Sequence, residues 1–257
     1  MTNAKYEAWI DGEALGAISP DLYICAITYT PAAVTINVNE IVGRWGELEE
    51  TTRWKGASVT VSFYLRKSTG QERQAILEQV GRWARGKYLE ISDRLGERLR
   101  VICSAPPYVP DHLSWTDAIS VTFRTLAQPF WERQTPAILT LSGETGSGNL
   151  FVPGNIGKAL VEVDAAPASG TLANITLTVG DTSITLNGVN ATSTDHLKIT
   201  YDERGIQSIK RGTTSVMSAR TAASSDDLLA ECGKISSISF SASTSASVTF
   251  SARGLSV

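Results

Sequence analysis

Strict alternation of apolar and polar side chains is clearest over residues 58–66 of the chain. Val59, Val61, Phe63 and Leu65 occupy every second position, and Ser, Thr or Tyr residues occupy the positions between them. Successive side chains of a strand point to opposite faces of its sheet, so this period indicates a β-strand with one buried face.

A helical period replaces the alternation directly afterwards, over residues 70–85. Thr69 and Glu72 have the spacing of a capping box, in which the Thr hydroxyl accepts a free backbone N–H of the first turn. Five residues form one apolar stripe at helical spacing: Ile76, Leu77, Val80, Trp83 and Ala84. We predict one helix that lies on a sheet, and we expect Gly86 to provide a left-handed exit.

Shorter β patterns fill the rest of the chain. An Asp11-Gly12 turn predicts a hairpin near the start. Further strands are expected at residues 22–30, 88–91, 99–104, 113–126, 235–240 and 245–251, and hairpins are expected at residues 175–186 and 198–210. The predicted fold class is therefore mainly β. A β-sandwich-like N-terminal domain with one packed helix precedes a C-terminal β-sandwich.

Composition changes near the middle of the chain. All six tryptophans precede residue 135, whereas Ser, Thr, Ala and Gly dominate the second half. The segment SGETGSGN and the nearby Pro136, Pro153 and Gly154 are typical of a linker or long loop. We expect domains at residues 1–135 and 155–257, with a linker at residues 136–154.

Charge and cysteine content narrow the possible partners. A net charge of -3 gives no general attraction to nucleic acid or to anionic lipid. Three widely separated cysteines favour reduced, buried thiols and cytosolic synthesis over a disulfide framework. No apolar run reaches the roughly 18 residues of a spanning helix, and no signal peptide is recognised, so membrane insertion is not expected.

Candidate catalytic chemistry is sparse. His112 and His196 lie in different predicted domains, outside any metal-ligand spacing, and the cysteines stand among apolar neighbours. GNIGKA has two residues between its glycines where a phosphate loop has four. We expect no catalytic, metal or cofactor-binding residues, and therefore no enzyme.

Two tryptophans bracket a polar stretch, RWGELEETTRW, and supply the candidate interface residues Trp45, Arg53 and Trp54. Trp and Arg are enriched at the energetic centres of protein interfaces, which favours a contact surface. Ordinary packing of the two indoles in the core is the simpler interpretation, and both interpretations stay open.

The order of segments resembles the distal tail protein (Dit) family of phages and prophages with long non-contractile tails. TRWKGASVTVSFYLR, QERQAILEQVGRWARGKY, LEISD, LRVICSAPPY and SWTDAISVTFRTLAQPFW carry the resemblance in the first half. NIGKALVEVDAAPASGTLANITLTVGDTSITLNG and GKISSISFSASTSASVTFSARG carry it in the second half. It covers nearly the whole chain through element order and loose apolar patterns.

This resemblance implies a structural hub at the virion tail tip. The N-terminal domains would form a ring, hexameric in the family, at the end of the tail tube. The galectin-like or jelly-roll C-terminal sandwiches would face outward. Implied partners are further copies of the chain, the tail tube protein, and a tail-associated lysin, tail fibre or receptor-binding protein. DNA would pass the lumen without sequence-specific binding.

The sequence is also compatible with two other functions. A Ser/Thr-rich sandwich is also a common lectin architecture, so the protein could bind carbohydrate. A tail-tube subunit would likewise be β-rich and ring-forming, but it would polymerise into long stacks.

Overall fold

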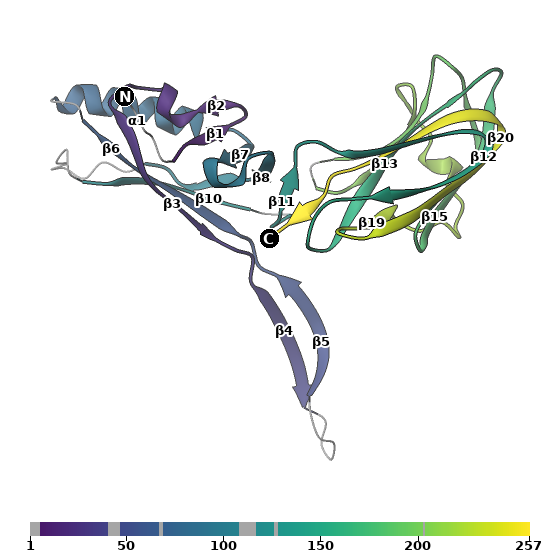
Figure 1. Cartoon of the computed structure of the whole chain (residues 1–257), viewed down its shortest axis with the longest axis horizontal. Coiled ribbons are helices and arrows are strands. Elements are labelled where there is room, and N and C mark those ends of the chain that lie inside the picture. The colour runs from purple at the N-terminus through teal and green to yellow at the C-terminus, as the bar shows by residue number, and fades with distance from the viewer. Residues whose placement is uncertain (1–5, 41–46, 67–68, 108–116, 126–127, 203) are drawn as a thin grey trace. The chain divides into compact units, whose positions relative to one another are not determined.

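The computed structural model describes residues 6–257 except 41–46, 67–68, 108–116, 126–127 and 203. It divides into two compact units, residues 1–131 with Val257, and residues 132–256. Each unit has a hydrophobic core of its own, and Trp131 is fully buried in the core of the first. The mainly β prediction is confirmed, because strands dominate both units (Figure 1).

A four-stranded antiparallel sheet forms the base of the N-terminal unit. Its strands, in spatial order, are β3 (Leu22–Thr30), β6 (Ser58–Leu65), β10 (Ile119–Arg124) and β9 (Ile102–Ala105). The predicted strand at 58–66 is β6, in which every second side chain is buried. Its alternation therefore reports one face packed on the core, as expected.

A second sheet covers the first. It contains β2 (Glu13–Ala14), β1 (Ala8–Ile10), β7 (Tyr88–Ile91) and β8 (Glu97–Arg100) in that order. Positive φ values at Asp11 and Gly12 close the β1–β2 hairpin, as the Asp-Gly pair predicts. The short 3-10 turn η1 (Leu15–Ala17) leads from β2 to β3 of the first sheet, and η2 (Ser92–Arg94) connects β7 to β8. Strand β11 (Trp131–Arg133) follows at the unit boundary.

Helix α1 (Gly70–Trp83) confirms the predicted helix and its N-terminal cap. The hydroxyl of Thr69 accepts a hydrogen bond from the Glu72 backbone N–H at 3.3 Å and donates one to the Glu72 carboxylate at 2.9 Å. The apolar stripe is buried, and the Trp83 ring packs edge-on against Phe123 of β10 at 5.8 Å. The helix thus lies on the sheet, as predicted.

The prediction for Gly86 at the end of this helix is wrong. It is absent from the positive-φ glycines, so it provides no left-handed exit. A Cβ at this position would lie 2.0 Å from the Ile10 side chain and 2.6 Å from an Asp11 carboxylate oxygen. Close approach of the chain to the β1–β2 hairpin is what requires glycine here.

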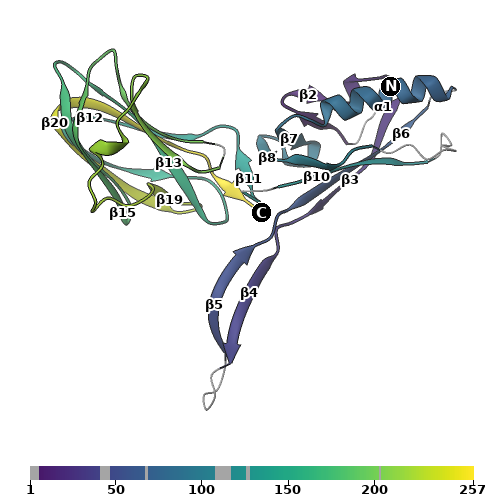
Figure 2. The same ribbon diagram turned by 180° about the vertical axis from the view of Figure 1, so that it is seen from behind.

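A two-stranded arm extends from the four-stranded sheet. It consists of β4 (Val34–Glu40) and β5 (Glu47–Trp54), which pair with each other in a sheet of their own. Figures 1 and 2 both show this ribbon leaving the ends of β3 and β6. Most of the polar stretch between the two tryptophans is therefore strand.

The C-terminal unit is built around two long paired strands, β12 (Ala137–Phe151) and β20 (Ile235–Ala252). The second half of β20 also pairs with β13 (Lys158–Pro167), and its first half pairs with β14 (Leu172–Val179). Remaining elements are β15 (Thr182–Ala191), β16 (Leu197–Tyr201), β17 (Gln207–Arg211), β18 (Thr214–Ser215), η3 (Met217–Ala219), β19 (Leu229–Glu231) and β21 (Leu255–Ser256).

The predicted C-terminal sandwich forms because this long ribbon folds over the core. The pairing of β12 with β20 shifts register just after Gly143, whose φ is +131°. Residues 137–143 then face residues 145–151, since a Cβ at Gly148 would lie 3.2 Å from Leu139 and Leu141. One curled sheet thereby provides both layers of the unit (Figure 2).

The predicted linker at residues 136–154 is wrong. Ala137–Phe151 is a 15-residue strand that pairs with β20 along its length. Its glycines serve packing: a Cβ at Gly146 would lie 2.5 Å from the Phe240 ring and 3.1 Å from Leu141. Glycine inside a strand marks a sharp bend or a close backbone approach, and here it marks both.

Candidate assembly surface

An exposed apolar cluster lies at the root of the β4–β5 arm. Trp54 and Val34 are cross-strand partners, and each side chain is 42% exposed. The Trp54 ring packs edge-on against Phe130, with 5.1 Å between ring centroids and 79° between planes. Large aromatic surface left open in this way is typical of a site where another protein packs.

The root itself is held firmly to the four-stranded sheet. The Ala57 N–H donates to the buried Thr125 hydroxyl oxygen at 2.8 Å, and the Thr125 N–H donates to the Ala57 carbonyl at 3.0 Å. A Cβ at Gly56 would lie 2.6 Å from the Thr125 carbonyl oxygen. The chain therefore passes too close for any other residue, which fixes the position of Trp54 two residues earlier.

The three predicted interface residues have different outcomes. Trp45 lies outside the described residues. Arg53 is on β5 opposite Thr35, and its side chain is likewise outside the described part of the chain. Trp54 is exposed at the arm's root, where it joins Val34 and Phe130. Sequence reasoning missed these two partners, although the alternation in VTINVNE is a signal for the strand that carries Val34.

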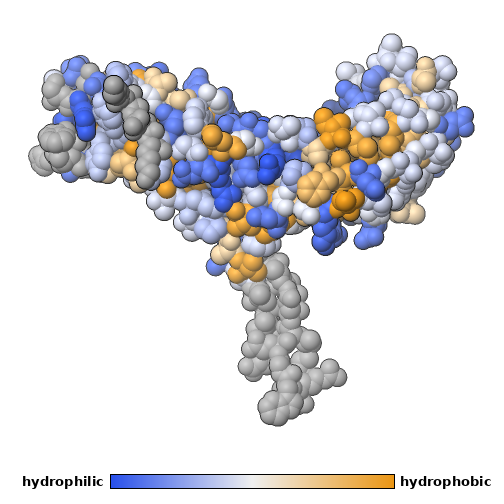
Figure 3. Space-filling model, in the orientation of Figure 1, coloured by the Kyte–Doolittle hydropathy of each residue, from blue (hydrophilic) through white to orange (hydrophobic). Residues whose placement is uncertain are grey.

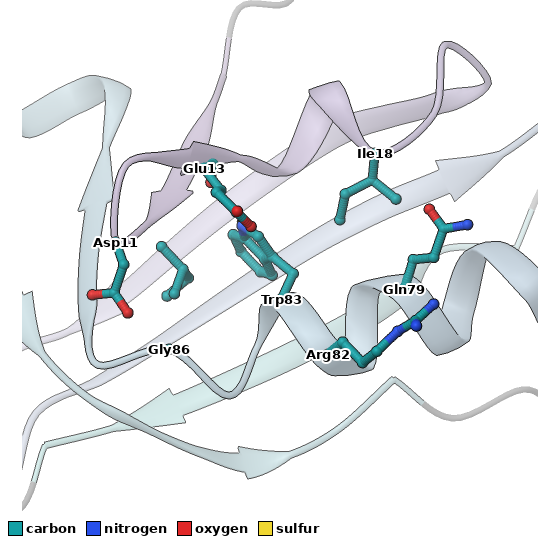
Figure 4. Close-up of a pocket in the computed structure, with 8 residues that line it drawn as sticks. Asp11, Glu13, Ile18, Gln79, Arg82, Trp83 and Gly86 are labelled. Atoms are coloured by element: carbon teal, nitrogen blue, oxygen red, sulfur yellow. The ribbon is translucent and has the colours of Figure 1, made fainter.

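A shallow hollow of about 500 Å³ lies between the β1–β2 hairpin and helix α1 (Figure 4). Its polar groups hold the fold together. The Trp83 indole N–H donates to the Glu13 carbonyl at 2.7 Å. The Asp11 carboxylate accepts the backbone N–H groups of Lys87 and Tyr88, both at 3.0 Å. The hollow therefore has the character of a structural junction.

Among the described candidate residues, His196 is paired with a carboxylate, and two cysteine thiols are partly buried. His196 Nδ1 lies 2.8 Å from Asp164 Oδ1, and Lys198 Nζ lies 3.4 Å from Asp164 Oδ2, in an exposed cluster. Burial raises the pKa of the Cys103 and Cys232 thiols, which favours the less reactive protonated form. Across the described residues, no group of three or more His, Cys, Asp or Glu side chains could hold a metal ion.

Comparisons with known proteins relate the whole chain to phage tail components. No family model and no curated protein sequence matches it. Among solved structures, the Dit protein of phage SPP1 superposes with a TM-score of 0.68 at 11% identity, covering 96% of this chain and 98% of that one. Its description is a hub of the adsorption apparatus in phages that infect Gram-positive bacteria.

Two structures of the phage P2 baseplate also match. The calcium form gives a TM-score of 0.53 at 8% identity, covering 97% of both chains. The strontium form gives 0.52 at 9% identity, covering 96% of this chain and 97% of that one.

The chain has a Dit-like fold.

This likeness confirms the resemblance noted from the order of segments. Coverage above nine-tenths on both sides means that the Dit-like fold includes both units, the arm-bearing one and the curled sandwich. At 11% identity the likeness resides in backbone architecture, so individual contact residues do not carry over. None of the described helices is both long and apolar enough to cross a membrane.

Proposed function

We propose that this protein is a structural distal tail protein, a hub that joins the end of a phage tail tube to the baseplate or receptor-binding proteins. The observation that carries the proposal is the match of both units, over almost the full length of both chains, to a protein described as an adsorption-apparatus hub. Matches to the baseplate of a second phage support the same role. Fold alone does not define function, so the role needs its own test.

The proposal assigns different tasks to the two units. Residues 1–131 form a ring with further copies, hexameric as in the Dit family, and residues 132–256 face outward to hold the adsorption proteins. The arm root supports this division, because Trp54 and Val34 offer apolar surface on a rigid base to a neighbouring subunit. The ring sits at the virion tail tip after synthesis in the bacterial cytoplasm, and DNA passes its lumen without specific binding.

Assembly of the purified full-length chain tests the hub proposal. Native mass spectrometry over a range of concentrations is expected to show a closed oligomer, and electron micrographs are expected to show rings. A chain that stays monomeric at every concentration, also when mixed with tail tube protein, contradicts the proposal. Extended filaments of the chain alone would instead identify a tail-tube subunit.

A further inference from the structure

The first strand of the C-terminal unit leaves one long backbone edge open. β12 pairs on one side with β20 along its whole length. Among the described residues, no strand and no backbone hydrogen bond occupies its other side. Its sequence, AILTLSGETGSGNLF, contains one charged residue, Glu144, and no proline. Exposed strand edges usually carry lysine or proline, which prevent pairing with another chain, and β12 carries neither.

The edge at β15, which ends the layer of β14 and the second half of β12, is covered by the protein itself. The backbone of residues 221–225 runs beside β15, where the Thr221 N–H donates to the Thr185 carbonyl at 3.0 Å. The Ser225 N–H donates to the Ser183 carbonyl at 2.7 Å, and the Ser183 N–H donates to the Ser225 hydroxyl at 3.0 Å. The fold thus protects the long edge at β15 and leaves the long edge at β12 available.

The core is also incomplete along the first half of β12. Leu139 and Leu141 face the core but remain half-buried, whereas Val161 and Val163 of β13 in the same layer are at most 2% exposed. On the outer face of the strand, Ile138 is 62% exposed. A strand added along residues 137–143 would therefore remove apolar surface from water on both faces.

We propose that the open edge of residues 137–143 binds an extended, uncharged segment of a partner protein as an additional β-strand. Main-chain hydrogen bonds would provide the affinity, as in other cases of strand addition. Alternating apolar side chains of the segment would lie beside Leu139 and Leu141 on one face and beside Ile138 on the other. A charged side chain in the segment would lose its hydration next to these residues.

A partner segment fits this edge better than a second copy of β12. In an antiparallel pair centred on Thr140, Ile138 would face the polar Ser142. Registers that bring Ile138 opposite itself leave pairing over only three residues, because the strand begins at Ala137 and the preceding residue is Pro136. An unconstrained segment can place an apolar residue opposite Ile138 and still pair along all of residues 137–143.

A second pair of solvent-exposed apolar side chains lies at the C-terminal end of β12. Phe151 and Ile235 are cross-strand partners that are 54% and 68% exposed. Figure 3 shows hydrophobic residues gathered on the visible face of the C-terminal unit. This pair lies past the bend at Gly143, so it serves as a separate reference surface when binding at residues 137–143 is mapped.

A peptide with the sequence SASVTFSA, residues 245–252, is a suitable probe. It is uncharged, its apolar residues alternate, and in the folded protein it is the segment that pairs with the inner edge of residues 137–143. Fluorescence anisotropy with the labelled peptide and the full-length chain is expected to show saturable binding. A peptide of the same composition with its apolar residues consecutive is expected not to bind.

Two matched lysine variants locate the site. Ile138→Lys is expected to weaken peptide binding at least tenfold, because it places a charge beside the added strand. Asn187→Lys, an exposed position on the self-covered β15, is expected to leave binding unchanged. Equal loss in both variants, or no saturable binding to the unmodified chain, overturns the proposal.

Hydrogen exchange distinguishes strand addition from exchange of β20. Amides of residues 137–143 are expected to gain protection with the peptide, while those of β20 keep theirs. Loss of β20 protection overturns the proposal. The proposal is also overturned if the chain forms an oligomer without peptide and Ile138→Lys abolishes that oligomer, because a second copy would then be the occupant of the edge. The ring is tested at Trp54 and this edge at Ile138, so the two proposals fail independently.

Discussion

The indole N–H of Trp83 donates a 2.7 Å hydrogen bond to the carbonyl oxygen of Glu13. It joins the last turn of α1 to the β1–β2 hairpin, while the rest of the ring packs on Phe123. One side chain thereby fastens the helix to both sheets of the N-terminal unit, as Figure 4 shows for the hairpin side.

Replacing Trp83 tests this link. Trp83→Phe keeps most of the apolar contact but leaves the Glu13 carbonyl without its partner, so we expect a loss of about 1 to 2 kcal/mol in unfolding free energy. Trp83→Ala adds a cavity and is expected to lose about 3 to 5 kcal/mol. Urea unfolding measures both. Gln79→Ala, on the exposed side of α1, is the control and should remain close to the unmodified chain.

Gly146→Ala tests the bend of the long ribbon. The added methyl would lie 2.5 Å from the Phe240 ring, so the two layers must separate or the ring must shift. Overpacking of this kind is expected to destabilise the C-terminal unit by about 1 to 3 kcal/mol. Thermal unfolding followed by far-ultraviolet circular dichroism measures the change. Ser147→Ala, at the neighbouring exposed position, should have little effect; an equal loss there would contradict the packing argument.

Burial of Tyr201 predicts that the C-terminal unit becomes less stable at alkaline pH. Burial raises the pKa of its hydroxyl, which accepts the Leu228 N–H at 3.0 Å. Because the folded state favours the neutral form, its stability is unaffected below the normal Tyr pKa of about 10 and falls as the pH rises above it. Chemical unfolding at pH 8 and pH 10.5 measures the loss.

Tyr201→Phe separates the hydrogen bond from the titration. The variant leaves the Leu228 N–H without this acceptor, so we expect it to lose about 1 to 3 kcal/mol at pH 8. It should also lose less stability than the unmodified chain between pH 8 and pH 10.5. An unchanged pH dependence would assign the alkaline effect to other groups.

Replacement of Trp54 tests whether the arm's root takes part in assembly of the proposed ring. Trp54→Ser removes the exposed indole from the arm's root and is expected to weaken assembly at least tenfold, as loss of an aromatic interface centre does. Leu95→Ser, at a side chain that is 78% exposed in the same unit, is the control and should assemble normally. Sedimentation velocity measures both. Equal assembly of the two variants would exclude Trp54 from the subunit contact.

The sequence predicts best those elements in which apolar residues recur at one regular spacing along the whole element. β6 alternates without interruption, and α1 combines a capping residue, Thr69, with an apolar stripe. In both, the local pattern and the buried face agree, so single-chain periodicity is sufficient.

The wrong linker prediction and the missed partners of Trp54 have physical causes. Glycines at 143, 146 and 148 suggest a linker because their usual role is flexibility. Here Gly143 has a positive φ at the bend, Gly146 lies against the Phe240 ring, and Gly148 lies against Leu139. No local pattern reports such contacts. The partners of Trp54 were missed for the same reason, since Phe130 follows it by 76 positions and meets it only in the folded unit.

The pairing of β12 with β20 also constrains how the protein can be made. Thr140 and Thr249 touch through their hydroxyls at 3.0 Å although they are 109 positions apart in the chain. The first strand of the unit can therefore pair only after β20 has left the ribosome. Such long-range closure slows folding and prolongs the exposure of apolar segments during translation. A truncation that removed β20 would consequently deprive both layers of their shared strand.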